Sequence, residues 1–336
     1  MLHRTPFTGL LGAACAALLL AGCGETTSGP GDNRAERVLT ITGPELRDWI
    51  ALLSDDSMMG RSTPSPELDE AATAIADRFR QLGLSGAFGG EFVQRYPVSS
   101  TEQSPNVGGL LEGSDSRLRA EVVVFVAHFD HIGPTFPRGT CPVTGADTVC
   151  NGANDNASGT AAVLELAEAF AGMEPLPKRS LLFLAVSGEE HGLWGSQYFV
   201  AHPPVPAGNI VAALDMDMIG RNAQDSIFVG GLYLSTLGDR ALAMATVHRE
   251  EGLRLAYIGQ GGSDDVSFAS GGIPSLMFFN GLHADYHKPS DTVDRLDPEL
   301  AARVTRLVFH LGLDVANAPG RPQWKPIRAA PRPEAR

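Results

Sequence analysis

Basic residues are scarce in this sequence. Its 336 residues include 26 lysines and arginines against 39 aspartates and glutamates, which gives a net charge of −13. A surface with this charge repels the phosphates of nucleic acids and of anionic lipids. The composition therefore argues against nucleic acid, or an anionic membrane surface, as the partner.

Several well-known site signatures are also missing. The sequence has no Walker-type phosphate loop, no Gly-rich dinucleotide fingerprint, no GxSxG nucleophile elbow and no internal repeat. Its hydrophobic fraction of 43% still allows a sizeable core, and the length suits one large α/β domain better than two equal ones.

The N-terminus has the features of an export signal. Arg4 supplies a short positive start, and the uncharged run 10–21 is too short to span a bilayer as a stable helix. The run ends in LAGC, which resembles a bacterial lipoprotein cleavage site. We expect residues 1–22 to be removed and Cys23 to be lipidated, although a plain secretory signal is the alternative. Gly24, in place of an aspartate, favours an outer-membrane envelope lipoprotein by the same resemblance.

Cysteines are few, and each has an expected role. Cys15 leaves with the signal and Cys23 is the lipidation site, so Cys141 and Cys150 remain as one pair. In an oxidising envelope compartment we expect these two to form a disulfide, because their spacing does not suit a CxxC-type zinc site. The mature chain loses one arginine and no acid, so its net charge is about −14.

The rest of the chain divides into a tether, a domain and a tail. Residues 23–43 are polar and rich in turn formers, residues 44–316 form one domain, and the Pro- and Arg-rich residues 317–336 are expected to be disordered. Two helical patterns, 45–55 and 65–84, should pack on a sheet. Buried strands are expected at 120–130, 180–190, 209–220 and 273–281, alternating with helices chiefly at 158–172, 196–202, 234–252 and 297–313. This alternation predicts an α/β fold with a mostly parallel, mixed central sheet and helices on both faces.

Polar residues that can bind metals follow the strongest strands, where ligands bind in open α/β sheets. His128 and Asp130 end the first strand, Glu189 and Glu190 follow the second, and Asp217 lies beside Asp215 in the apolar run of the third. Buried carboxylates are costly unless paired or bound to cations. Taken alone, the histidine could be structural and the two glutamates a solvated surface turn.

Two loops complete the pattern. The stretch NGANDNASG centres on Asp155, whose two oxygens could bridge two cations, although such a cluster before a helix is often an ordinary turn and N-cap. A loop after the last strand contains His283, Asp285, His287 and Asp291. Clustered His and Asp beyond a strand are suggestive of a metal site.

The motifs AHFDH, GANDNASG, SGEEHGLWGS, LDMDMIGR, GGSDDVSF and DYHKPSDT occur in that order. This series resembles the co-catalytic di-zinc aminopeptidases of clan MH, over about residues 45–315. The resemblance implies their phosphorylase/hydrolase-like zinc exopeptidase fold and two zinc ions, although cobalt or manganese would also suit the ligands. It implies the ligands His128, Asp155, Glu190, Asp217 and His287, with Asp155 bridging, Glu189 as general base, Asp130 and Asp291 as supporting residues, and Tyr286 as an oxyanion donor. The family's SDH pattern reads Ser263-Asp264-Asp265 here, which questions a substrate-binding role for that loop.

The expected activity is removal of N-terminal residues from peptides with a free N-terminus. Two metals would activate a bridging water for attack, and Glu189 would take its proton. The alternatives are a one-zinc glutaminyl cyclase-like enzyme, or a non-enzymatic envelope lipoprotein with the same fold. Ile219, Phe268, Phe278 and Phe279 could line the substrate pocket or belong to the core.

Overall fold

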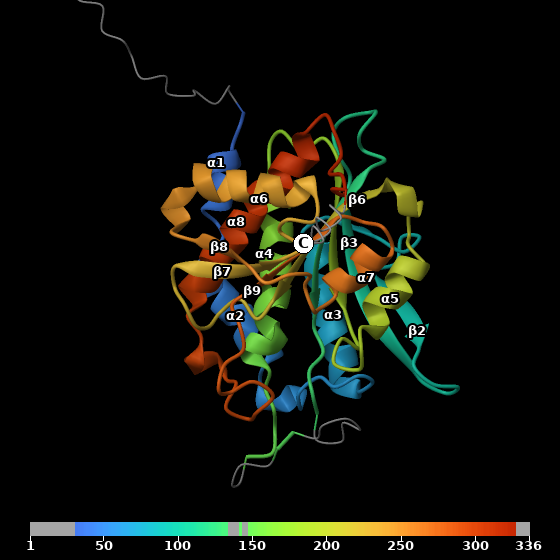
Figure 1. The fold of residues 1–336 in the computed structure, drawn as a ribbon. Helices are drawn as coiled ribbons and strands as arrows, with labels where there is room; N and C mark the ends of the chain where they lie inside the picture. Colours follow the sequence, from blue (N-terminus) through green and yellow to red (C-terminus); the bar gives the residue numbers. More distant parts are fainter. Residues whose placement is uncertain (1–30, 134–140, 143–146, 327–336) are drawn as a thin grey trace, which may run out of the picture.

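The structure is a computed structural model that describes residues 31–133, 141–142 and 147–326 (Figure 1). A nine-stranded mixed sheet runs through its centre in the order β1-β3-β5-β4-β6-β9-β7-β8, with β2 paired to β3. The parallel core consists of β4, β5, β6 and β9, as the sequence predicts. The strands are β1 (Ser85–Gly86), β2 (Val93–Pro97), β3 (Gln103–Leu111), β4 (Val122–His128), β5 (Ser180–Val186), β6 (Ile210–Asp217), β7 (Ser226–Gly230), β8 (Arg254–Tyr257) and β9 (Ser275–Phe279).

The continuous apolar runs of the central strands reflect burial on both faces. All seven residues of β4 are buried, and the six apolar ones before His128 alternate between two hydrophobic clusters. Val123 and Phe125 belong to the larger cluster, whereas Val122 and Val124 belong to the smaller one on the opposite face. Successive side chains of a strand point to opposite faces, so a strand covered by helices on both sides needs apolar residues throughout.

Two groups of helices cover the sheet (Figure 1). Helices α3, α4, α6 and α8 pack on one face, and α5 and α7 pack on the other. We expected the first long helix to pack on the sheet as well, but α2 packs mainly on α4 and α8. The helices are α1 (Arg34–Val38), α2 (Gly43–Leu53), α3 (Pro66–Gln81), α4 (Ser158–Ala171), α5 (Trp194–Ala201), α6 (Thr236–Val247), α7 (Asp265–Ser270) and α8 (Pro298–Asn317).

The parallel strands bring distant loops together. Because β4, β5, β6 and β9 run in one direction, the loops after His128, Val186, Asp217 and Phe279 leave the sheet at the same edge. The turn that precedes α4 reaches this edge too, since Asn156 Nδ2 donates to the carbonyl of Met216 at 2.9 Å. The motifs that contain the candidate ligands therefore have a common location.

The two ends of the domain differ from expectation in detail. Residues 34–38 of the expected tether form α1, which packs against α4. Beyond α8, the chain to residue 326 lies along the domain: Trp324 Nε1 donates to the carbonyl of Gly272 at 2.8 Å, and Arg321 Nε donates to Glu121 at 2.9 Å. The signal with Cys23, and residues 327–336 of the tail, lie outside the described residues.

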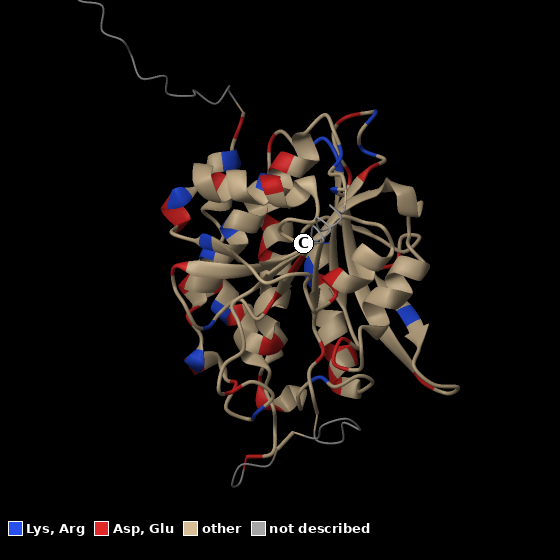
Figure 2. Ribbon diagram, in the orientation of Figure 1, with Lys and Arg blue, Asp and Glu red and all other residues tan. Residues whose placement is uncertain are grey.

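Charge and hydropathy agree with the composition. Lysines and arginines are scattered among more numerous acidic residues in the described part of the chain (Figure 2). Within that part, none of the helices has the length and apolar character needed to cross a membrane. Cys141 and Cys150 are joined by a disulfide, as the sequence suggests.

Candidate metal centre

Asp155 lies at the centre of the site, in the turn Ala153–Ala157 that leads into α4. Asp291 supports this turn directly: its Oδ2 accepts from the backbone N–H groups of Asn154 and Asp155, at 3.0 and 3.1 Å. Asn156 anchors the other side, because its Oδ1 accepts from the N–H of Met218 at 3.2 Å. The carboxylate of Asp155 is thus presented from a backbone that is tied to two other loops.

Three carboxylate- and imidazole-bearing residues form a first cluster. His128 ends β4, Asp217 ends β6, and Asp155 lies between them. His128 Nε2 is 3.6 Å from Asp155 Oδ1 and 3.5 Å from Asp217 Oδ1. All three side chains are buried. One potential ligand atom from each lies within 4.8 Å of the others, which is close enough to share one cation.

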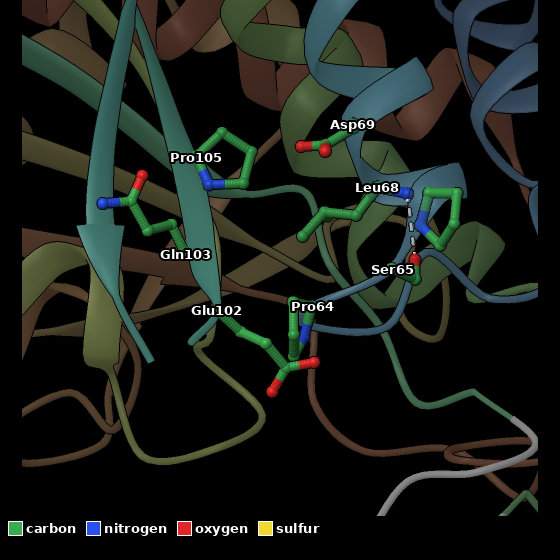
Figure 3. Close-up of a pocket in the computed structure, with 8 residues that line it drawn as sticks. Pro64, Ser65, Leu68, Asp69, Glu102, Gln103 and Pro105 are labelled. Atoms are coloured by element: carbon green, nitrogen blue, oxygen red, sulfur yellow. Dashed lines mark hydrogen bonds between the residues drawn. The ribbon is translucent and has the colours of Figure 1, made fainter. Parts of the chain in front are cut away.

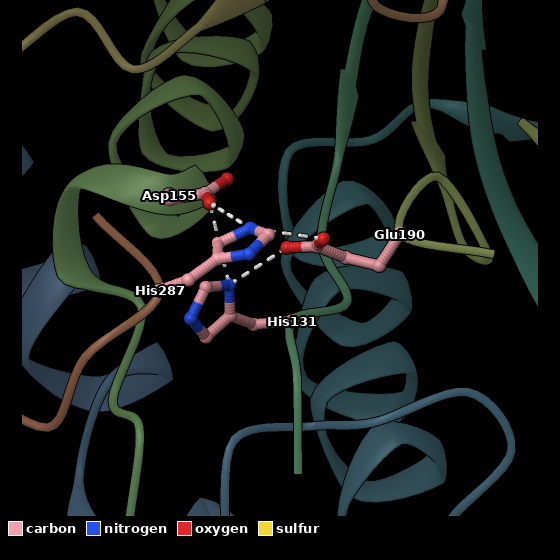
Figure 4. Close-up of side chains that lie close together, drawn as sticks. All are labelled: His131, Asp155, Glu190 and His287. Carbon is pink, nitrogen blue, oxygen red and sulfur yellow. Dashed lines mark hydrogen bonds and ion pairs between the residues drawn. The ribbon is translucent and has the colours of Figure 1, made fainter. Parts of the chain in front are cut away.

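A second cluster uses the other oxygen of Asp155. His287 Nε2 is 3.1 Å from Asp155 Oδ2 and 3.1 Å from Glu190 Oε2. Figure 4 shows these side chains, with His131, pointing toward one another from four separate segments. Since Asp155 belongs to both clusters, the structure brings together all five residues that the resemblance implies as ligands.

His131 is the member of the second cluster that our sequence reasoning missed. Its Nδ1 is 2.9 Å from Glu190 Oε1, and its side chain is fully buried. The signal was available, because His131 closes the motif AHFDH three residues after His128. From that motif, the sequence-based prediction gives roles only to His128 and Asp130.

The donor set fits a metal such as zinc. Asp155 Oδ2, Asp217 Oδ1 and His287 Nε2 are buried and make no hydrogen bond among the described residues. Buried polar atoms are normally paired, and unpaired ones call for an explanation. Imidazoles and carboxylates converging at such distances are the ligands that zinc, cobalt and manganese accept.

Electrostatics at the site also favours a bound cation. Burial, together with the neighbouring Glu190, raises the pKa of Asp155, and burial raises the pKa of Glu189 well above its usual value. For His128, burial lowers the pKa, but the nearby carboxylates of Asp130 and Asp217 outweigh it and the pKa rises. Ionising these carboxylates together is therefore costly, and a bound metal ion would lower that cost.

Asp130 and Glu189 lie next to the ligands. The carbonyl oxygen of Asp130 is 3.2 Å from His128 Nδ1 and its Oδ1 is 3.6 Å away, so the backbone is the nearer partner of the imidazole. Its carboxylate also accepts from the N–H of Glu189 at 3.3 Å and from Thr63 Oγ1 at 3.0 Å. Asp130 thereby connects the loop after β4 to the loop after β5.

A cavity of about 320 Å³ opens beside the clusters. Asp155, Glu189, Asp217 and Tyr286 form its polar wall, and the Tyr286 ring stacks on His287 with 3.8 Å between centroids. The remaining lining is largely apolar: Met218, Ile258, Met277, Phe279 and Leu282, with Gln260, Gly261 and Gly262.

Only one of our four pocket candidates lines this cavity. Phe279 does so, whereas Ile219, Phe268 and Phe278 are fully buried in the core. The Ser263-Asp264-Asp265 loop contributes through the preceding Gly261 and Gly262, and both aspartates are buried behind them. Another hollow of about 250 Å³, at the start of α3, contains none of the ligand residues (Figure 3).

Arg61 is a buried cation that holds this region together. It is fully buried, and its guanidinium donates to the carbonyls of Leu53, Phe129, Asn151 and Gly152. Burial lowers its pKa to about 10, with Asp130 and Asp155 opposing that change, so Arg61 stays charged at neutral pH. One side chain thus joins the loop after β4 to the loop that presents Asp155.

Solved structures share this architecture. LapB from Legionella pneumophila matches with a TM-score of 0.67 at 22% identity, covering 84% of this chain and 75% of that one. An aminopeptidase from Aneurinibacillus sp. strain AM-1 matches with a TM-score of 0.67 at 16% identity, covering 88% and 98%. The fold is therefore the α/β fold of solved zinc aminopeptidases, with a candidate metal centre at the carboxyl edge of its sheet.

The sequence comparison is more specific. The pattern of peptidase family M28 matches residues 106–312, and the chain belongs to this family. Aminopeptidase YwaD of Bacillus subtilis is 26% identical over 222 residues, which are 62% of this chain and 44% of that protein. A probable leucine aminopeptidase of Arthroderma otae is 26% identical over 226 residues, or 64% and 59%. The chain thus spans about half the length of these curated relatives.

Replacing Arg61 tests how far the site's framework depends on a buried charge. We expect Arg61→Met to lower the free energy of unfolding by about 3–5 kcal/mol, because it leaves four buried carbonyls without their donor and removes a positive charge near Asp130 and Asp155. Urea unfolding with a metal chelator present measures the effect without a contribution from bound metal. Arg254→Met, at an exposed arginine paired with Asp225, should leave stability almost unchanged. Equal stability of the two variants would contradict the assigned role.

Proposed function

We propose that this protein is a zinc-dependent aminopeptidase that removes N-terminal residues from peptides. The observation that carries the proposal is the arrangement of two ligand clusters around Asp155, beside a cavity whose wall includes Glu189. Membership of peptidase family M28 supports hydrolysis of peptide bonds as the reaction. The aminopeptidase relatives support action at the N-terminus.

Two zinc ions fit the ligands best. His128, Asp155 and Asp217 would hold one ion, and Asp155, Glu190 and His287 would hold the other, with cobalt or manganese as possible replacements. When bound, such a pair lowers the pKa of water and polarises a carbonyl group. The protein's own contribution is to fix the ligands and to handle the proton.

Glu189 is our proposed general base. It lies on the cavity wall with Asp155 and Asp217, and burial with the neighbouring carboxylates raises its pKa. A base of raised pKa near the reacting water can accept its proton and pass it to the leaving amine. Tyr286 lies on the same wall, and burial raises its pKa, so its hydroxyl keeps the proton it would donate to the developing oxyanion.

The lining of the cavity supports a preference for the N-terminal ends of peptides. A free α-amine is cationic and would lie beside the acidic wall formed by Glu189 and Asp217, with the first side chain among Met218, Met277 and Phe279. A glutaminyl cyclase-like enzyme with one zinc, or a receptor-like protein without catalysis, would not need both clusters. Analysis giving one tightly held zinc per chain would favour the cyclase.

Replacement of Glu189 tests its proposed role as the general base. We expect Glu189→Ala and Glu189→Gln to reduce hydrolysis of leucyl-nitroanilide by about 10²–10⁴-fold, since general-base catalysis contributes that much. Metal analysis should still give close to two ions per chain. Glu102→Gln changes a glutamate that lines the other hollow and should keep full activity. An unimpaired Glu189 variant would refute the assigned base.

A substrate panel tests both the exopeptidase activity and the cavity. Leucyl- and methionyl-nitroanilides should be cleaved at least about 10-fold faster than the alanyl compound, because an apolar cavity distinguishes side chains by about 1–3 kcal/mol per methylene. Lysyl and aspartyl compounds should be poor substrates, and a zinc chelator should abolish all cleavage. N-acetyl-leucyl-nitroanilide serves as the control, and its cleavage at the leucyl rate would contradict recognition of a free amine.

We also propose that the mature protein is a cell-envelope lipoprotein that is anchored through Cys23 and hydrolyses peptides outside the cytoplasm. Support comes from the apolar run that ends in LAGC. Labelled palmitate should be incorporated by the full chain in a bacterial host and not by Cys23→Ser, with Cys15→Ser as the matched control. Release of unlabelled protein from cells expressing the unaltered chain would refute the anchor.

A further inference from the structure

His131 occupies a fixed position inside the second cluster. It is fully buried, and its Nδ1 lies 2.9 Å from Glu190 Oε1 and 3.6 Å from Asp155 Oδ2. Its ring packs against the backbone of Gly152, where a Cβ atom would come within 2.5 Å of the imidazole. Gly152 also has a φ of 59°, which glycine adopts without strain. The ring therefore has little room to turn.

Two roles are open to an imidazole at this place. It can bind a metal through Nδ1, or it can donate a proton from Nδ1 to the carboxylate of Glu190. The two roles require different tautomers, because a ligating nitrogen offers its lone pair whereas a donating nitrogen carries the hydrogen. The surroundings of the second ring nitrogen therefore decide between them.

Nε2 of His131 favours the donor role. It is buried and has no hydrogen-bond partner among the described residues. If Nδ1 bound a metal, the hydrogen would be on Nε2, and a buried N–H without an acceptor is penalised. Histidines that bind metals almost always donate their other N–H to an acceptor, as His128 can to Asp130. With the hydrogen on Nδ1, Nε2 carries only a lone pair and Nδ1 has an acceptor at 2.9 Å.

The same hydrogen bond orients Glu190. Its Oε1 is the oxygen that faces His131, while Oε2 lies 3.1 Å from His287 Nε2. His287 Nε2 is in turn 3.1 Å from Asp155 Oδ2. With Oε1 occupied, three donor atoms remain to face a cation: Glu190 Oε2, Asp155 Oδ2 and His287 Nε2. Catalytic zinc sites have three protein ligands and an open position, whereas structural sites have four.

We propose that His131 is a positioning residue, which donates its Nδ1–H to Glu190 Oε1 and so presents Oε2 to the metal. This inference rests on the proposed metal centre and adds a sixth residue that the centre requires. His131 does not itself bind the ion. The second cluster is therefore kept as a three-ligand site with room for water or substrate.

Two variants at position 131 separate a donor from a ligand. His131→Asn keeps an N–H donor near the place of Nδ1, and His131→Leu removes it. We expect the leucine variant to bind one of its two zinc ions about 10–100-fold more weakly, as loss of an orienting partner does. The asparagine variant should stay within a few-fold of the unaltered protein. Titration of the metal-free proteins with zinc against a chromogenic chelator measures both affinities.

X-ray absorption spectroscopy on the zinc-loaded proteins gives a second measurement that does not depend on activity. If His131 is a donor, two imidazoles, those of His128 and His287, are bound per pair of zinc ions in both the unaltered protein and His131→Asn. His202→Asn, at an exposed histidine after α5, is the matched control and should leave both measurements unchanged.

The outcomes are distinct. A third zinc-bound imidazole that disappears in His131→Asn would make His131 a ligand and overturn the proposal. A leucine variant that binds both ions as tightly as the unaltered protein would overturn it as well. If the leucine variant does not fold, the imidazole count in His131→Asn still decides. Failure of the unaltered protein to bind two zinc ions would instead count against the proposed function.

Discussion

The organising constraint of this molecule is the burial of several carboxylates at one edge of its sheet. Asp155 and Asp217 are buried there, and the partly buried Glu189 and Glu190 converge with them. Anions in an apolar interior are stable only when positive charge or hydrogen-bond donors compensate them. Arg61 supplies a permanent charge near the loops, but it donates to backbone carbonyls, and Asp155 Oδ2 and Asp217 Oδ1 make no hydrogen bond among the described residues. A bound metal such as zinc would supply the positive charge that these carboxylates still need.

The backbone around these carboxylates is held in place by hydrogen bonds with neighbouring side chains. Asp291 holds the N–H groups around Asp155, and Asn156 ties the same turn to the end of β6. Met218 and His287 have φ values of 55°, a left-handed conformation that is unfavourable for residues with a side chain. Such strain persists where the surrounding structure enforces it, often at functional sites. Both residues lie at the candidate centre, which agrees with a geometry set by the whole loop framework.

Much of the fold, and the convergence of the candidate ligands, could be predicted because each has a strong local signal. Strands such as β4 are continuous apolar runs, and the ligands occur in motifs directly after them. His131 belongs to one of these motifs, AHFDH, but the motif does not show its role, because that role depends on the distance to Glu190, which is 59 positions away in the sequence. The cavity was equally hidden: Ile258 and Leu282 come from loops beside β8 and β9, and only their packing shows that they share a wall. Phe268 and Phe278 were indistinguishable from Phe279 by composition, and burial alone separates them.

Glu189 and Glu190 are neighbours in sequence, yet the structure gives them different surroundings. Glu190 lies between His131 and His287, and the effect of these two imidazoles exceeds that of burial and lowers the pKa of Glu190, which suits the proposed ligand role. Glu189 lines the cavity beside Asp217 and has a raised pKa, as a proton acceptor should. Because consecutive residues of a turn point in different directions, one acidic pair can serve both the metal and the proton. The roles proposed for the two glutamates separate only if Glu190 is held away from the cavity, and the hydrogen bond proposed between His131 and Glu190 would hold it in that position.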